Sequence, residues 1–132
     1  MPEPGRTGAA RRLLLTLLPL LLLQGCGDGA ARDEAAAAPG ELTWRRNCYS
    51  CHASGAAGAP RLGDAEAWAP RVAQGWPTLM RHTLEGLRGM PARGLCRQCD
   101  DEELAVTLAW MLTRSGGLPP DAPASVVPPA AP

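Results

Sequence analysis

The pentapeptide Cys48-Tyr49-Ser50-Cys51-His52 is the feature that most restricts the fold of this 132-residue chain. Two thiols separated by two residues on one helical turn can each form a thioether with one vinyl group of a haem. The histidine that follows then points an imidazole nitrogen at the iron. The spacing therefore predicts a domain built around covalently bound haem. The alternative is a redox-active or zinc-binding C-x-x-C that happens to precede a histidine.

The N-terminus carries the features of an exported protein. Arginines precede an apolar stretch from Leu13 to Leu23, which predicts a signal peptide over residues 1–25. This stretch is interrupted by Pro19 and is shorter than the roughly 20 residues that a lasting transmembrane helix needs. We therefore expect cleavage rather than a transmembrane anchor.

Leu23-Gln24-Gly25-Cys26 resembles a bacterial lipoprotein box, in which the chain is cut before the cysteine and a diacylglyceryl group is placed on its sulfur. Gln24 departs from that pattern, because a smaller residue is commoner there. We expect a periplasmic protein held on a membrane by a lipid on Cys26. The alternative is an ordinary signal peptide followed by a stray cysteine.

Two of the five cysteines remain once the haem motif and Cys26 are assigned. In an oxidising compartment, Cys96 and Cys99 are expected to form a local disulfide. A second haem site is the alternative, but Asp100 stands where its histidine ligand would be needed. We therefore expect one haem.

Composition separates a single domain from its flanking segments. Residues 26–39 comprise Cys26 and a linker rich in Gly, Ala and acids, and residues 117–132 contain six prolines with few large apolar side chains. Both segments are predicted to be solvated, the second as a disordered tail. Residues 40–116 remain as a small domain whose marginal core a haem would complete.

The charge balance argues against nucleic-acid binding. Removing residues 1–25 takes away three of the thirteen basic residues and one of the thirteen acids, so the mature chain is weakly acidic. The chain has no lysine and no basic stripe that would follow a phosphate backbone.

We expect an all-α fold of about four short helices, because no stretch alternates apolar and polar residues long enough to indicate a sheet. The first helix is predicted from about Gly40 through Arg46 into the haem motif. The second is expected near Asp64, a capping residue, and the third starts with Pro77 at its first position.

The last helix has the clearest end signals. Asp100 and Glu103 form a capping-box-like pair at its start, and Gly116 supplies a stop. Its buried face is predicted to contain Leu104, Leu108, Met111 and Leu112, with Val106 and Trp110 on an adjoining stripe.

The ligand opposite His52 decides between gas or peroxide binding and electron transfer. The candidates are Met80, Met90, Met111 and His82. Met90 is preferred, because Gly89-Met90-Pro91 lies between helices, whereas the other methionines lie on apolar helix faces, where methionine usually packs a core. A thioether sulfur at the iron would favour the reduced state.

Five sequence blocks, in their order and spacing, resemble class I cytochromes c, specifically the small bacterial cytochrome c5-like proteins. They are the haem motif, Gly58–Asp64, Trp68–Arg71, Gly89–Ala92 and Cys96–Asp100. The resemblance covers about Gly40 to Arg114. It implies a small cytochrome fold around one haem c, His/Met ligation, and one-electron transfer with transient redox partners rather than enzyme activity.

The resemblance also assigns expected roles to individual residues. The Pro60 carbonyl is expected to accept a hydrogen bond from His52, and Leu62 to pack on the porphyrin. Trp68 and Arg71 are expected near a haem propionate.

Further expectations concern the Met90 loop and the helix crossing. The resemblance implies a Cys96–Cys99 disulfide that tightens the loop after Met90. It also implies a close crossing of the first and last helices at Gly40, near Trp44 and Trp110. The chain departs from the family pattern at Leu95, where a second glycine is common, and in having no Phe or Lys.

Two other functions remain open from the sequence. One is a haem enzyme or gas-binding site with a labile Met90, and the other is a haem-bearing, non-catalytic subunit of a respiratory or sulfur-oxidising complex. A carrier would need a weak docking surface. Because the chain has no lysine, its positive candidates near the haem edge are Arg61, Arg88 and Arg93.

Overall fold

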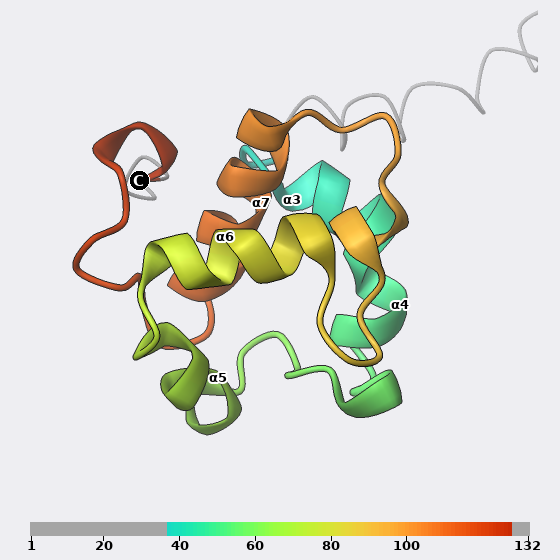
Figure 1. Ribbon diagram of the computed structural model, residues 1–132, viewed down its shortest axis with the longest axis horizontal. Coiled ribbons are helices and arrows are strands. Elements are labelled where there is room, and N and C mark those ends of the chain that lie inside the picture. Colours follow the sequence, from blue (N-terminus) through green and yellow to red (C-terminus); the bar gives the residue numbers. More distant parts are fainter. Residues whose placement is uncertain (1–36, 128–132) are drawn as a thin grey trace, which may run out of the picture. The chain divides into compact units, whose positions relative to one another are not determined.

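Helices make up almost all the regular structure of residues 37–127, the part of the chain that the computed structural model describes (Figure 1). Within this range, strand pairing is limited to an isolated bridge between Leu87 and Met90. The expectation of an all-α fold is therefore confirmed. The predicted signal peptide and the predicted lipid site at Cys26 lie outside the described residues. No helix between residues 37 and 127 is both long and apolar enough to cross a membrane.

The first helix consists of three consecutive parts and ends with the haem motif. They are α3 (Glu41–Thr43), the π-helical turn η2 (Trp44–Cys48) and α4 (Tyr49–His52). Asn47 Nδ2 donates to the Thr43 carbonyl at 3.1 Å beside the π turn. A π turn changes the rotational phase of the residues after it and often occurs at functional sites. Here it separates buried Trp44 from the motif residues that line a cavity.

Capping side chains and a proline mark the starts of the next two helices. The short turn η3 (Ala56–Gly58) precedes α5 (Ala65–Val72), where the Asp64 carboxylate accepts from the Ala67 N–H at 2.9 Å. The helix α6 (Trp76–Glu85) has Pro77 at its second position rather than at the predicted first. Pro77 fits there as well, because that N–H also lacks a helical partner.

The last helix, α7 (Asp101–Thr113), begins as predicted at Asp100, whose carboxylate accepts from the Glu103 N–H at 2.7 Å. The Glu103 carboxylate accepts from the Thr43 hydroxyl at 2.5 Å, a bond that joins α7 to the first helix. The two helices cross closely at Gly40. A Cβ on Gly40 would lie 2.7 Å from the Val106 carbonyl oxygen, so only glycine fits.

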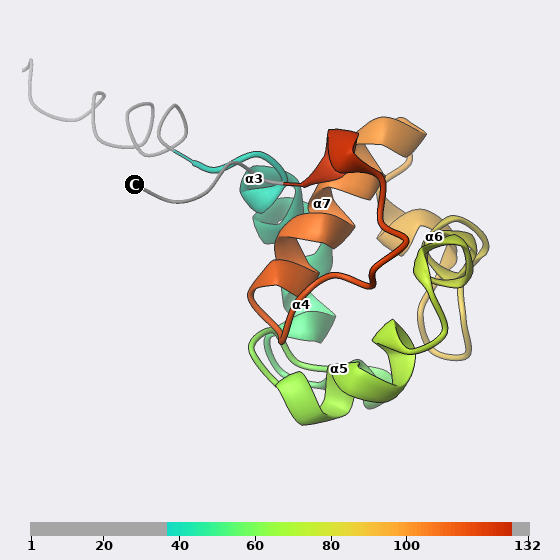
Figure 2. The ribbon, with the colours of Figure 1, turned by 90° about the vertical axis from the view of Figure 1, so that its left-hand side faces the viewer.

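The last helix lies between the first helix and α6 (Figure 2). Its predicted apolar face is buried, but burial extends around most of the helix. The buried residues are Leu104, Ala105, Thr107, Leu108, Ala109, Trp110, Met111 and Leu112. Trp110 packs against Trp44 with ring centroids 5.2 Å apart, and Val106 is only partly buried. A helix with neighbours on two sides does not need a single apolar stripe.

The structure differs from the predicted solvated tail over residues 118–127. Leu118 and Val126 pack against the main core, and the short turn η5 (Ala124–Val126) lies on α7. Both Asp121 carboxylate oxygens accept from the Trp76 N–H, at 3.0 and 3.1 Å, at the start of α6. Proline content misled the prediction, because a few apolar side chains and one capping carboxylate suffice to fix this segment. Residues 128–132 lie outside the described part.

Candidate haem-binding site

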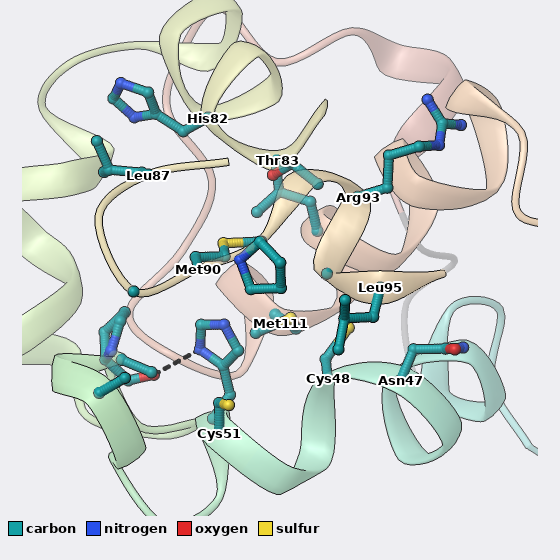
Figure 3. Close-up of a pocket in the computed structure, with 18 of the residues that line it drawn as sticks. Asn47, Cys48, Cys51, His82, Thr83, Leu87, Met90, Arg93, Leu95 and Met111 are labelled. Atoms are coloured by element: carbon teal, nitrogen blue, oxygen red, sulfur yellow. Dashed lines mark hydrogen bonds between the residues drawn. The ribbon is translucent and has the colours of Figure 1, made fainter. Parts of the chain in front are cut away.

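A cavity of about 590 Å³ lies between the haem motif, α6, α7 and the loop that carries Met90 (Figure 3). Apolar side chains from α6 and α7 form part of its wall, namely Leu79, Leu104, Leu108 and Met111. Cys48, Cys51 and His52 line it from the first helix. The fold therefore directs the motif residues into one mostly apolar cavity, as a bound porphyrin requires.

His52 is held in one tautomer by a backbone group. Its Nδ1 lies 2.8 Å from the carbonyl oxygen of Pro60, the expected hydrogen bond (dashed line in Figure 3). A carbonyl can only accept, so Nδ1 carries the proton and Nε2 keeps its lone pair for a metal. Burial lowers the pKa of His52, the Pro60 bond opposes this shift, and the charge of Arg71 adds to it. The imidazole is thus neutral, the form that binds iron.

Trp68 and Leu62 both support the wall that carries His52, and their predicted contacts with the haem stay predictions. The Trp68 ring stacks on the His52 ring with centroids 5.7 Å apart, and its indole N–H donates to the Arg61 carbonyl at 2.8 Å. This bond engages the indole N–H, and the Trp68 ring itself lines the cavity. Leu62 packs against the main core instead of lining the cavity, and its N–H donates to the His52 carbonyl at 2.7 Å.

The two motif cysteines are free thiols that line the cavity. Burial, together with the neighbouring Cys51, raises the pKa of Cys48 to about 11. A redox-active C-x-x-C has the opposite property, since its reactive thiol has a lowered pKa. Residues 37–127 also contain no group of three His, Cys, Asp or Glu side chains placed to hold a metal ion. The environment of Cys48 fits a thiol that is consumed in a covalent bond.

Met90 projects into the cavity from the loop between α6 and α7 (Figure 3). The loop turns back after α6 through two hydrogen bonds between Leu87 and Met90, at 2.9 and 3.0 Å. Two other candidate ligands also line the cavity, which the sequence did not indicate. Met111 lies on its α7 wall, and His82 lies at its edge near Leu87. Met80 packs against the main core.

The loop after Met90 forms the turn η4 (Ala92–Leu95) and then the disulfide Cys96–Cys99. Both half-cystines are buried, in a small cluster with Leu104. Leu95 has a φ of 69° and a side chain that is 68% exposed. The left-handed conformation explains why glycine is common at this position and shows that leucine adopts the same backbone at a cost.

The charged residues that line the cavity are all basic. Arg71, Arg88 and Arg93 line it, together with His82, and no Asp or Glu among residues 37–127 does so. A haem carries two carboxylates, so an apolar cavity with a basic edge fits it. The thiols, the oriented His52 and this charge pattern together match the chemistry of haem c.

Comparison with known proteins agrees with this geometry. Residues 35–111 match the family model described as cytochrome c oxidase, cbb3-type, subunit III. The chain is 40% identical to cytochrome c-555 of Chlorobaculum tepidum over 93 residues, which cover 67% of this chain and 83% of the relative. It is 38% identical to cytochrome c5 of Azotobacter vinelandii over 66 residues, 48% of this chain and 80% of the relative.

The chain belongs to this family of cytochromes c. It therefore carries haem c, attached covalently through the C-x-x-C-H motif at Cys48 and Cys51. A solved cytochrome c, in a structure titled as an electron transfer complex with nitrite reductase, shares 43% identity with this cytochrome. That similarity has a TM-score of 0.55 and covers 58% of this chain and 94% of the other. The predicted class I cytochrome c fold is confirmed.

One relationship at the site had no signal in the sequence of this cytochrome. Arg93 donates to the Cys99 carbonyl at 2.6 Å and pairs with Asp101 at 2.8 Å. The sequence predicts a docking role for the charge of Arg93, as for Arg61 and Arg88. In the structure, the charge of Arg93 is instead paired with that of Asp101. Arg88 also lines the cavity, and it is exposed and has no ion pair among residues 37–127.

Proposed function

We propose that this cytochrome is a one-electron carrier of a bacterial periplasmic electron-transfer chain, with His52 and Met90 as the two axial ligands of its haem iron. The observation that carries this proposal is that both side chains line one cavity from different segments, His52 from the end of α4 and Met90 from the loop after α6. When bound, haem c supplies the reversible exchange of one electron at iron.

The protein residues hold and tune this centre. His52 presents Nε2 in a fixed direction because the Pro60 carbonyl binds Nδ1. Trp68 packs against the imidazole and limits its rotation. A neutral thioether from Met90 favours ferrous over ferric iron, which raises the reduction potential relative to a second histidine.

Met90 is preferred over the other cavity-lining candidates because of where it lies. Gly86 and Pro91 bound its loop: a Cβ on Gly86 would lie 2.8 Å from the Met90 carbonyl oxygen, so the turn is fixed tightly. Met111 is 4% exposed and belongs to the packed core of α7. His82 lies at the cavity edge on α6.

Arg71 is proposed to bind a haem propionate. It lines the cavity and is close enough to His52 for its charge to lower the pKa of the imidazole. Its Nη1 donates to the Ala67 carbonyl, which fixes the guanidinium on α5 while leaving other N–H groups for a carboxylate.

Docking of redox partners is proposed at the open edge of the cavity. Leu87 and Leu95 are exposed large apolar side chains at this edge, and Arg88 adds a positive charge. A small apolar patch with few charges suits brief contacts, which an electron carrier needs. A lipid on Cys26 would keep the domain close to membrane-bound partners.

A second proposal is a haem-bearing subunit of a larger respiratory complex. The matched family model favours this candidate, because the family is described as a subunit of an oxidase. Purification from native membranes separates the two. A carrier elutes as a free monohaem protein in detergent, and a subunit co-elutes in fixed stoichiometry with other chains.

The carrier function is tested with the holoprotein made in cells that attach haem. Haem content by the pyridine haemochrome method and a potentiometric titration followed by absorption should give one haem that survives denaturation and one reversible one-electron step. Haem that is released by denaturation, or a ferrous protein that consumes oxygen or peroxide with turnover, would contradict the proposal.

A further inference from the structure

The loop next to Met90 has a backbone that needs outside support. Arg93, Gly94 and Leu95 have φ angles of 58°, 57° and 69°, so three consecutive residues of η4 are left-handed. Only glycine adopts this region without cost, and runs of it are rare. Two of these residues carry side chains, so local preferences oppose the observed turn.

This turn touches the residues that matter for the haem. A Cβ built on Gly94 would lie 3.9 Å from the Met90 methyl carbon and 4.0 Å from the Cys48 sulfur. The turn therefore lies next to both the Met90 side chain and the Cys48 sulfur, which would carry a thioether bond to the haem. A displacement of η4 would move the sulfur of Met90 relative to the rest of the cavity.

One side chain ties the turn to the rigid part of the domain. The guanidinium of Arg93 donates from Nη2 to the Cys99 carbonyl at 2.6 Å, and its Nη1 lies 2.8 Å from Asp101 Oδ1. Cys99 is fixed by its disulfide, and Asp101 is the first residue of α7. The fork of an arginine can reach both acceptors at once, which a lysine cannot.

We propose that Arg93 is a positioning residue: it ties the left-handed turn η4 to the start of α7 and thereby keeps the Met90 sulfur at the iron. This inference rests on the proposed His52/Met90 ligation. It assigns to Arg93 a role inside the loop in place of the docking role expected from the sequence.

The two contacts should differ in strength. Asp101 is 68% exposed in its side chain, so water screens the ion pair, and such pairs change equilibria by less than about fivefold. The bond to the Cys99 carbonyl is partly buried and involves a charged donor, which is worth about tenfold or more. Most of the effect of Arg93 should therefore come through Cys99.

Imidazole binding to the ferric holoprotein measures how readily Met90 leaves the iron. The loss of the far-red ferric band gives the apparent affinity. We expect Arg93→Gln to bind imidazole about tenfold more tightly than the wild type. Arg93→Lys should lie between the two, and Asp101→Asn should change the affinity by no more than about fivefold. If Arg93→Gln does not accumulate, the Lys variant carries the test.

Arg45→Gln is the matched control, because it removes an arginine ion pair, to Glu41 at 2.6 Å, on the first helix. Its imidazole affinity should equal that of the wild type. If Arg93→Gln binds imidazole with an affinity within twofold of the wild type, the positioning role of Arg93 is wrong. The same holds if the imidazole affinity of Arg45→Gln rises as much as that of Arg93→Gln. A wild-type ferric protein without a far-red band would instead contradict the proposed His52/Met90 ligation. The positioning role of Arg93, which rests on that ligation, would then be contradicted as well.

Discussion

The Nδ1 atom of His52 lies 2.8 Å from the carbonyl oxygen of Pro60, and the Trp68 ring stacks on the imidazole with ring centroids 5.7 Å apart. These contacts fix the tautomer and the orientation of the His52 imidazole. The imidazole is also buried, so protonation of His52 is unfavourable in the folded protein.

Acid should leave His52 neutral in the folded protein and weaken folding instead. Burial lowers the pKa of His52 below its ordinary value, and iron bound at Nε2 would exclude the proton as well, so the unfolded chain binds a proton that the folded chain does not. The free energy of unfolding should therefore fall as the pH is lowered through about 6.5, by at most about 1.4 kcal/mol per pH unit. Guanidinium unfolding at pH 7.5 and 5 measures this difference.

The measurement is made in a His82→Gln background, because the chain contains only two histidines. The ferric spectrum of the folded protein should stay the same over this pH range. A spectral transition with a midpoint near pH 6.5, or unchanged stability at pH 5, would show that His52 is accessible to protons.

Leu95→Gly should stabilise the protein. Leu95 has a φ of 69° and is 68% exposed, so glycine relieves backbone strain and removes little buried surface. The relief of about 1–2 kcal/mol exceeds the flexibility cost of glycine, about 0.5–1 kcal/mol. We expect a gain of about 0.5–1 kcal/mol in the free energy of unfolding. Leu87→Gly is the control and should destabilise, because Leu87 is not among the residues with positive φ. If Leu95→Gly is less stable than the wild type, the claim that the backbone is strained at Leu95 is wrong.

Arg88→Gln should slow oxidation of the ferrous protein by ferricyanide at low ionic strength. Arg88 is an exposed cation at the cavity edge, and ferricyanide is an anion that a nearby positive charge attracts. We expect about a two- to fivefold decrease that disappears at high salt. Arg97→Gln is the control, because exposed Arg97 does not line the cavity. Equal oxidation rates in Arg88→Gln and the wild type would exclude the cavity edge beside Arg88 as the place where ferricyanide reacts. An equal decrease in the rate of Arg97→Gln would exclude it too.

Asp121→Ala should lower stability without a change in the haem spectrum. The Asp121 carboxylate accepts from the Trp76 N–H at the start of α6, and removal of such a cap costs about 1 kcal/mol. Ser125→Ala is the control in the same segment. If Asp121→Ala is as stable as the wild type, the bond between Asp121 and the Trp76 N–H does not hold residues 118–127 against α6 in solution.

Local signals predicted most of the helices because their ends are encoded by single side chains. Asp64 and Asp100 each cap a backbone N–H three residues on, as their sequence context indicates. The haem motif and the Met90 loop were likewise visible, because short motifs specify them. The order of these blocks, together with the family resemblance, was enough to predict that His52 and Met90 belong to one site, and both line the same cavity.

Relationships between distant residues were not predictable in the same way. The π turn at Trp44–Cys48 depends on tertiary contacts and has no composition signal. The packing of Val126 depends on a space beside α7 that only the folded chain creates. The pairing of Arg93 with Asp101 depends on a left-handed turn that leucine and arginine ordinarily avoid.

The ferric absorption spectrum of Met90→Ala, compared with that of the wild type, tests the proposed iron site most directly. We expect covalent haem in both proteins, a far-red ferric band in the wild type, and loss of this band in Met90→Ala, with Met111→Leu retaining it. A wild type without the band, or a Met90→Ala protein that keeps it, would show that another group occupies the iron position opposite His52.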